Sequence, residues 1–178
     1  GRGVHHKVIV ATAVEVRQCA PDSAHSKRRG GRVAGRVRLA AVPDRSAESL
    51  CCFIKSVVKP TTKIVTDDWT GYAGLNRMDY EHPPVAERGD PSIAEEFLPI
   101  IHLVFANLKT WPMGTHHGVS HQHLQVYLNE FTFRFNRRHY SFNAFRSLLG
   151  IARAVAAPTY DGLYSGEGHH TKYIVGVG

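Results

Sequence analysis

The sequence has 178 residues, of which 43% are hydrophobic and 21% are charged, values that suit one soluble globular domain with a buried core. No apolar run approaches the roughly 20 residues of a membrane-spanning helix, and the chain does not open on a hydrophobic signal segment, so a cytoplasmic protein without a membrane partner is expected. The formal net charge of +7 favours a polyanionic partner, although a soluble basic protein of another kind would carry the same charge.

Strand signals dominate the first part of the chain. Residues 7–16 are rich in β-branched side chains and predict a strand, and residues 36–42 predict its hairpin partner across a basic loop. Ser46 is the expected N-cap of an apolar helix. Residues 63–66 then predict a short buried strand beside the first two, and Asp67 follows it directly.

Helical periodicity dominates the second part. A helix is expected from residue 96, with Pro112 and Gly114 ending it, and residues 121–138 and 142–156 predict two more. Residues 158–178 show no clear period and predict a flexible tail. The order of elements predicts an α/β fold, a mixed sheet flanked by helices, within one domain over residues 1–157.

Metal sites built on cysteine or clustered histidine are disfavoured. The three cysteines are odd in number and lack Cys-x-x-Cys spacing, which argues against a disulfide framework or a structural zinc site. Four histidines lie close together in the sequence but match no standard zinc signature: His116, His117, His121 and His123.

Three other features are candidates for chemistry. Asp67, a carboxylate at the end of a predicted strand, suits a hard divalent cation, although an aspartate that caps a turn is the commoner case. His102 and Lys109 are seven residues apart, which places both on one helix face. A half-buried histidine and a solvated lysine without a shared role would explain the same pair. A basic cluster closes the predicted helix at residues 121–138, where cations either complement the helix C-terminus or meet DNA phosphates: Arg134, Arg137 and Arg138.

Together these segments resemble the ISXO-like transposase domain, a branch of the DDE insertion-sequence transposases. Residues 64–72 (IVTDDWTGY) resemble the family's second-aspartate motif. Residues 102–111 (HLVFANLKTW) and 114–120 (GTHHGVS) resemble its third-ligand helix and the exit from that helix, and residues 124–138 resemble its closing helix. The resemblance runs from about residue 8 to residue 156 in the family's order.

The resemblance implies a ribonuclease H-like fold and a two-metal reaction with Mg²⁺ or Mn²⁺. Water would cut a strand at the transposon end, and the freed 3′-hydroxyl would attack target DNA. It implies that Asp67 is the second aspartate and a metal ligand, and that His102 stands where the third acidic ligand usually lies. Lys109 would be the basic residue of the site that contacts DNA phosphate. The implied partners are transposon-end and target DNA, bound by a homo-oligomer at the prokaryotic nucleoid.

Two departures from the family pattern qualify this interpretation. The family's first aspartate lies on a strand before residue 7, and no residue of this sequence occupies that place. We therefore expect an N-terminally truncated catalytic domain, with its first strand missing, that is inactive by itself. A non-catalytic DNA-binding remnant, or a nuclease of the same fold that cannot join strands, are the alternatives. His102 is also a softer ligand than a carboxylate and a weaker partner for Mg²⁺.

Overall fold

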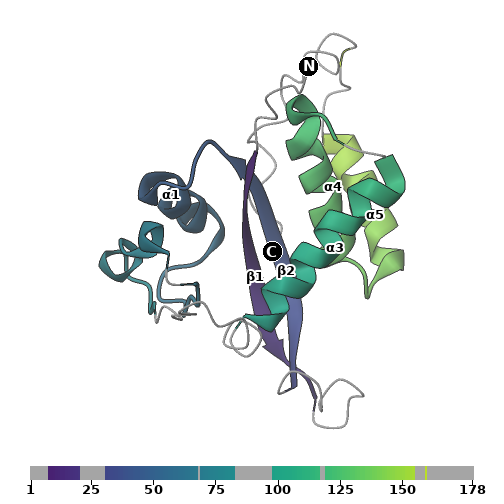
Figure 1. Ribbon diagram of the computed structural model, residues 1–178. Coiled ribbons are helices and arrows are strands. Elements are labelled where there is room, and N and C mark those ends of the chain that lie inside the picture. Colours follow the sequence, from purple (N-terminus) through teal and green to yellow (C-terminus); the bar gives the residue numbers. More distant parts are fainter. Residues whose placement is uncertain are drawn as a thin grey trace, which may run out of the picture. The chain divides into compact units, whose positions relative to one another are not determined.

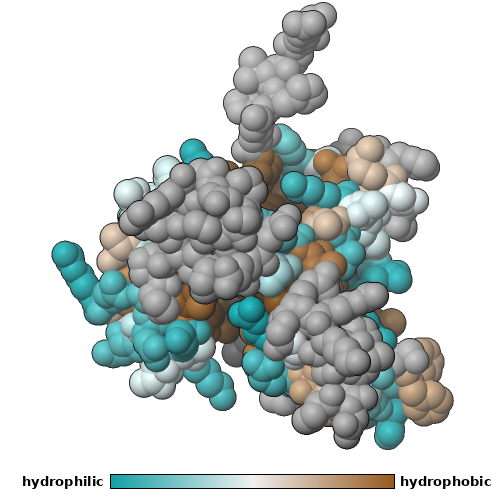
Figure 2. Space-filling model, turned by 60° about the horizontal axis from the view of Figure 1, so that its bottom comes forward, coloured by the Kyte–Doolittle hydropathy of each residue, from teal (hydrophilic) through white to brown (hydrophobic). Residues whose placement is uncertain are grey.

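The computed structural model describes residues 8–20, 31–67, 69–82, 98–116, 119–154 and 159. The chain divides into two compact units, residues 1–110 and residues 111–178, which are described separately below. Of the helices that the structure describes, none is both long and apolar enough to cross a membrane. On the face shown in Figure 2, hydrophilic and hydrophobic residues are interspersed.

The first unit is built on a long antiparallel hairpin of β1 (Ile9–Gln18) and β2 (Arg32–Val42), drawn in purple and dark blue in Figure 1. The two predicted strands are confirmed, but β1 ends two residues later than expected and β2 begins four residues earlier. Residues 32–35, predicted as loop, belong to β2, because the backbone pairing continues on the far side of an irregularity between Val14 and Val16.

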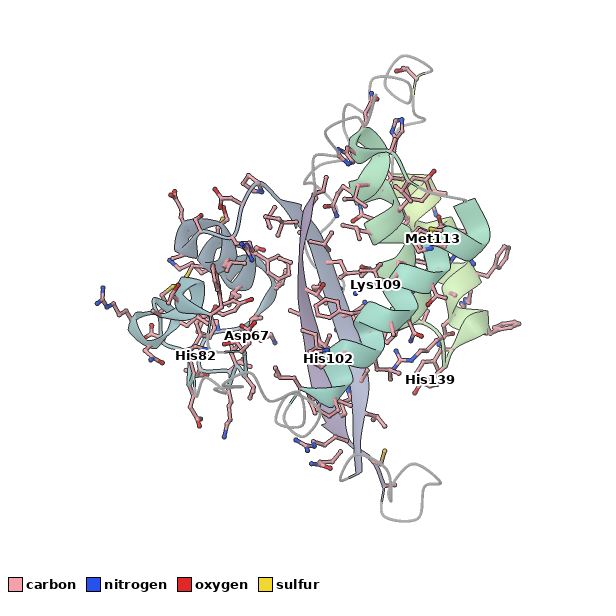
Figure 3. All side chains as sticks on the ribbon, in the orientation of Figure 1. Asp67, His82, His102, Lys109, Met113 and His139 are labelled. Atoms are coloured by element: carbon pink, nitrogen blue, oxygen red, sulfur yellow. The ribbon has the colours of Figure 1, made fainter. Side chains whose placement is uncertain are left out.

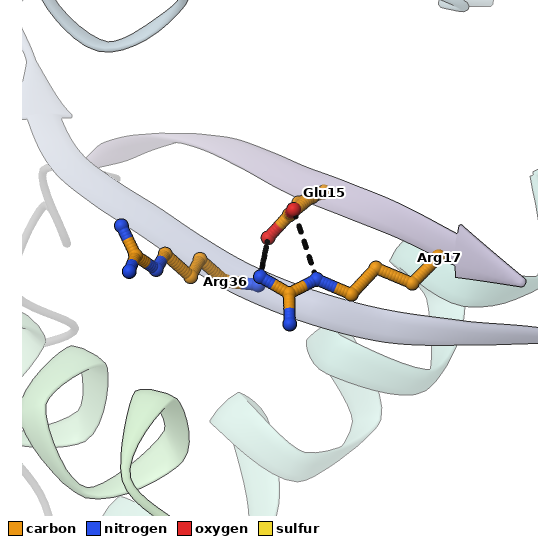
Figure 4. Close-up of polar contacts among 3 residues, drawn as sticks. All are labelled: Glu15, Arg17 and Arg36. Atoms are coloured by element: carbon orange, nitrogen blue, oxygen red, sulfur yellow. Dashed lines mark hydrogen bonds and ion pairs between the residues drawn. The ribbon is translucent and has the colours of Figure 1, made fainter. Parts of the chain in front are cut away.

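That irregularity is a β-bulge in β2, where Gly35 and Arg36 lie opposite Glu15, and polar side chains stabilise it (Figure 4). The Glu15 carboxylate accepts hydrogen bonds from the backbone N–H of Arg36 and from the Arg17 guanidinium, each at 2.9 Å. The hydrogen bond from Arg17 is the main cause that lowers the pKa of Glu15; partial burial opposes it and the Arg36 N–H adds to it. A Cβ at Gly35 would lie 2.5 Å from the carboxylate oxygen, so a larger residue here would displace the Glu15 and Arg17 side chains.

Helix α1 (Ala47–Val57) begins as predicted, with the Ser46 hydroxyl accepting a hydrogen bond from the Ser49 N–H at 3.2 Å. Its buried residues pack with the hairpin and with the segment after it into the core of this unit. The fully or nearly buried members of that core are Ala11, Leu50, Phe53, Ile54, Leu75 and Tyr80.

The prediction of a third sheet strand over residues 63–66 is wrong for this structure. In the described part of the chain the sheet has two strands, and Lys63 forms only an isolated bridge with Glu81. The Ile64 N–H donates to the Glu81 carbonyl at 2.8 Å, so the backbone bonds of this segment go to residues 79–81 and not to the hairpin. Val65 is 42% exposed, whereas an internal strand buries both faces.

The segment that follows forms two short 3₁₀ helices, η2 (Thr70–Tyr72) and η3 (Leu75–Arg77). Leu75 is fully buried, and the Tyr80 hydroxyl donates to the Val58 carbonyl at 3.0 Å. These contacts anchor the segment around Asp67 to the end of α1.

Helix α3 (Pro99–His116) corrects the predicted helix end. The helix passes through Pro112 and Gly114, which were expected to end it. A proline inside a helix removes one N–H···O bond and displaces one carbonyl, but the bonds of the residues after it can still form. Residues 83–97, which include the predicted start of this helix, lie outside the described residues.

The second unit contains η4 (His121–His123), α4 (Leu124–Asn136) and α5 (Ser141–Ala154), in agreement with the two predicted helices. Aromatic rings fill its centre: the Trp111 ring centroid lies 5.8 Å from that of Phe131, which lies 5.7 Å from that of Phe135. Of the predicted tail, only Thr159 is among the described residues. The fold is a mixed α/β arrangement of a two-stranded antiparallel sheet and several helices.

Candidate active site

Asp67 lies at the end of the segment that pairs with residues 79–81, and its side chain is exposed to solvent (Figure 3). The Thr66 hydroxyl donates to the Asp67 carbonyl at 2.8 Å, so a side-chain hydrogen bond restrains the backbone at this position. No ion pair joins Asp67 to a described cation. The structure therefore presents an exposed carboxylate on a backbone that Thr66 restrains, and no ion pair within the described residues neutralises its charge.

The side chains of Tyr72 and His82 lie next to the segment that carries Asp67. Their ring centroids are 6.3 Å apart, and the His82 Nε2 lies 2.7 Å from the Thr66 hydroxyl oxygen. Burial raises the pKa of the Tyr72 hydroxyl, and the negative charge of the nearby Asp67 carboxylate raises it further. Sequence reasoning missed His82, because a single histidine before Pro83 and Pro84 has no periodicity to mark it.

Trp69, two residues after Asp67, contacts the start of α1. Its indole N–H donates to the Arg45 carbonyl at 3.3 Å, and the Arg45 guanidinium carbon lies 4.8 Å from the ring centroid. A Cβ at Gly71 would lie 2.7 Å from the indole nitrogen, so glycine is what lets the ring close over the turn. Trp69 and Gly71 are thus held against the start of α1.

Helix α3 carries both His102 and Lys109, and both are exposed (Figure 3). Ile100 and Val104, one turn apart, are the buried residues of this part of the helix. His102 and Lys109 fall about 200° and 180° round the axis from Ile100, on the side opposite to it. The ring of His102 makes an edge contact with Phe105, with centroids 6.5 Å apart.

Asp67, His102 and Lys109 all belong to the first unit. The described residues include no group of three or more histidine, cysteine, aspartate or glutamate side chains that could hold a metal ion. Asp67 and His102 therefore supply, at most, part of a ligand set within the region that the structure describes.

The three arginines at the end of α4 differ in their contacts. Arg134 forms an ion pair with Glu130 at 2.8 Å, one turn back on the helix. Arg138 donates to the Phe135 carbonyl at 2.7 Å and stacks on the Phe135 ring at 4.0 Å, so it complements the helix C-terminus. The Arg137 guanidinium carbon lies over the Phe133 ring, 4.1 Å from its centroid, a cation–π contact.

The sequence was compared with models of known protein families. The family model of the ISXO2-like transposase domain matches residues 1–136. The chain belongs to the ISXO2-like transposase family. The matched range contains Asp67, His102, Lys109 and Arg134 and ends at the last residue of α4, so the resemblance seen in the sequence motifs is confirmed for this part of the transposase.

No curated protein and no solved structure is significantly similar to the transposase. The family acts on DNA, which agrees with the formal net charge of +7.

Proposed function

We propose that residues 1–157 are the catalytic domain of a DDE-type transposase with a ribonuclease H-like fold, and that residues 158–178 are a flexible tail. The proposed reaction is metal-dependent cleavage of DNA at the ends of an insertion sequence, followed by strand transfer into target DNA. One observation carries this proposal: Asp67 lies within the family's matched range, and its carboxylate is exposed and not ion-paired to any described cation. The Thr66 hydroxyl holds the backbone carbonyl of the same residue.

Asp67 and His102 are the residues that would hold Mg²⁺ or Mn²⁺. Both side chains are exposed, and one oxygen donor and one nitrogen donor fit a divalent cation as part of its ligand set. When bound, a pair of such ions activates the attacking oxygen and stabilises the leaving oxygen. Asp67 would contribute a negative charge to the site. The Thr66 hydroxyl limits the movement of the backbone from which the Asp67 side chain extends.

Four basic residues are proposed to bind DNA. Lys109 lies two turns from His102 on the exposed side of α3, about 10 Å further along the axis, where an ammonium group can meet a phosphate next to the cleaved bond. The other three end α4 and would contact the backbone without reading sequence: Arg134, Arg137 and Arg138. Two transposon ends must be cut and joined, so a homo-oligomer on DNA at the prokaryotic nucleoid is part of the proposal.

The test compares two aspartates of the first unit. In a chain that also carries the family's first aspartate on a strand ahead of Val8, Asp67→Asn should lower the rate of Mg²⁺-dependent cleavage of transposon-end DNA by at least 100-fold. Asp79→Asn is the matched control: Asp79 is also exposed and has a φ of 54°, a conformation that asparagine accepts equally well.

Unchanged cleavage in the Asp67→Asn variant would refute the proposed mechanism. If neither this protein nor its variants cut DNA but all bind it, the alternative of a non-catalytic DNA-binding remnant is favoured.

A further inference from the structure

His82 is a polar side chain buried next to the proposed catalytic turn. It is 8% exposed, and its ring faces Tyr72, which packs against the core of the first unit. The proposed function gives His82 no role. Burying an imidazole costs solvation free energy that a phenylalanine of similar size would not lose, so its hydrogen bonds require an explanation.

The hydrogen bonds from His82 lead to Asp67. The His82 Nε2 lies 2.7 Å from the Thr66 hydroxyl oxygen, and that hydroxyl donates its single hydrogen to the Asp67 carbonyl at 2.8 Å. The hydroxyl must therefore accept the hydrogen bond from the ring, and the proton of the ring lies on Nε2. The order of donation is His82 Nε2–H to Thr66 O–H to the Asp67 carbonyl.

The other ring nitrogen is consistent with a neutral imidazole. Within the described part of the chain, the His82 Nδ1 is buried and has no hydrogen-bond partner. Burial also lowers the pKa of His82. A neutral ring with its proton on Nε2 leaves an unused lone pair on Nδ1, which is tolerable, whereas a proton there would lack an acceptor.

We propose that His82 is a positioning residue for Asp67, acting through the Thr66 hydroxyl. The two hydrogen bonds fix the backbone carbonyl of Asp67, and with it the direction in which the Asp67 carboxylate leaves the backbone. This inference rests on the proposed function of Asp67. Side chains that orient a catalytic or metal-binding group in this way typically contribute about 10- to 100-fold to activity or metal affinity.

The contact is open to test by conservative substitution at both ends. Thr66→Val has nearly the same shape as threonine but lacks the hydroxyl, and His82→Phe keeps a ring without a donor. Thr66→Ser keeps the hydroxyl, and His82→Gln keeps an amide N–H that reaches as far as Nε2. Thr12→Val is the matched control, because the Thr12 hydroxyl is also buried in this unit but has no hydrogen-bond partner among the described residues.

Two measurements separate positioning from a structural role. In the chain with the first aspartate, Thr66→Val and His82→Phe should each lower kcat for cleavage about 10-fold or more with KM for DNA unchanged, while Thr66→Ser, His82→Gln and Thr12→Val should stay within about threefold of the parent. In the 178-residue chain without metal, nitrogen NMR of the His82 ring should show the neutral form protonated on Nε2, and the Nε2 proton should exchange faster in Thr66→Val.

Each outcome decides the proposal. Equal kcat in the parent and in Thr66→Val, or a ring protonated on Nδ1, would overturn the positioning role even if Asp67→Asn is inactive. If His82→Phe fails to fold, Thr66→Val still decides, because it is buried only in part and nearly isosteric. Normal cleavage by Asp67→Asn would instead refute the proposed function itself, so the two failures are distinguishable.

Discussion

The turn around Asp67 and the C-terminal end of α4 both carry charged residues, but they hold them in different ways. At the turn, a buried histidine and a threonine hold the backbone, and the carboxylate itself is exposed without a described cationic partner. At the end of α4, the arginines lie on aromatic rings or pair with a neighbouring carboxylate or carbonyl. The first arrangement suits chemistry that depends on one fixed oxygen, and the second suits electrostatic contact with a phosphate backbone.

The core beneath the Asp67 turn and helix α5 also differ in how deeply their leucines are buried. Leu75, which supports the turn, is fully buried, whereas Leu148 of α5 is 53% exposed. Leu75→Ala should lower the free energy of unfolding by about 2–5 kcal/mol, because it removes buried methyl groups and leaves a cavity. Leu148→Ala should change it by no more than about 0.5 kcal/mol. Urea denaturation followed by circular dichroism measures both, and a similar loss in the two variants would contradict the proposed difference.

Arg137 and Arg138 should separate DNA binding from stability. Arg138→Ala removes a hydrogen bond to the carbonyl end of α4 and should cost about 0.5–1 kcal/mol of stability. Arg137→Ala, which loses only a cation–π contact, should leave stability nearly unchanged but weaken binding to all duplex sequences and reduce the slope of log affinity against log salt by about 1. Fluorescence anisotropy at several salt concentrations measures the slope; an unchanged slope in Arg137→Ala would exclude a phosphate contact there.

The smallest expected effect concerns the β-bulge. The folded protein lowers the pKa of Glu15 from its ordinary value of 4.5, so the ionised form favours folding. This contribution is complete above the ordinary pKa and is lost as the pH falls through the lower folded pKa. Because the Glu15 side chain is 44% exposed, the effect should stay below about 1 kcal/mol. Thermal midpoints at pH 7 and pH 3 should converge between the parent and Glu15→Gln at the lower pH; a constant difference would contradict the assignment.

Local signals in the sequence predicted most of the elements correctly. Ser46 before an apolar helix, the β-branched hairpin and the aromatic stripe of α4 each follow from backbone and periodicity rules that act within a few residues. Residues 63–66 misled because the β-branched Ile64, Val65 and Thr66 fit a sheet strand as well as they fit an isolated extended segment. Their partners, residues 79–81, were decided by tertiary pairing.

The candidate site was predictable only where a family motif marked it. Asp67, His102 and Lys109 were found through the motif and not through spacing, since each has a common structural explanation of its own. His82 lies 15 residues after Asp67 and meets Thr66 only through the fold, so no local pattern connects them. The contacts of Arg134 and Arg138 likewise depend on side-chain geometry that composition does not contain.

The central claim, that Asp67 binds a catalytic metal ion, is tested most directly by exchanging its oxygen ligand for sulfur. Asp67→Cys should be studied in a chain that carries the family's first aspartate, with cleavage of transposon-end DNA measured in Mg²⁺ and in Mn²⁺. Mg²⁺ prefers oxygen ligands and accepts thiolate poorly, whereas Mn²⁺ tolerates it better. If Asp67 binds the metal ion, cleavage should be undetectable in Mg²⁺ and should recover in part in Mn²⁺. Cleavage in Mg²⁺ at the rate of the parent protein would contradict it.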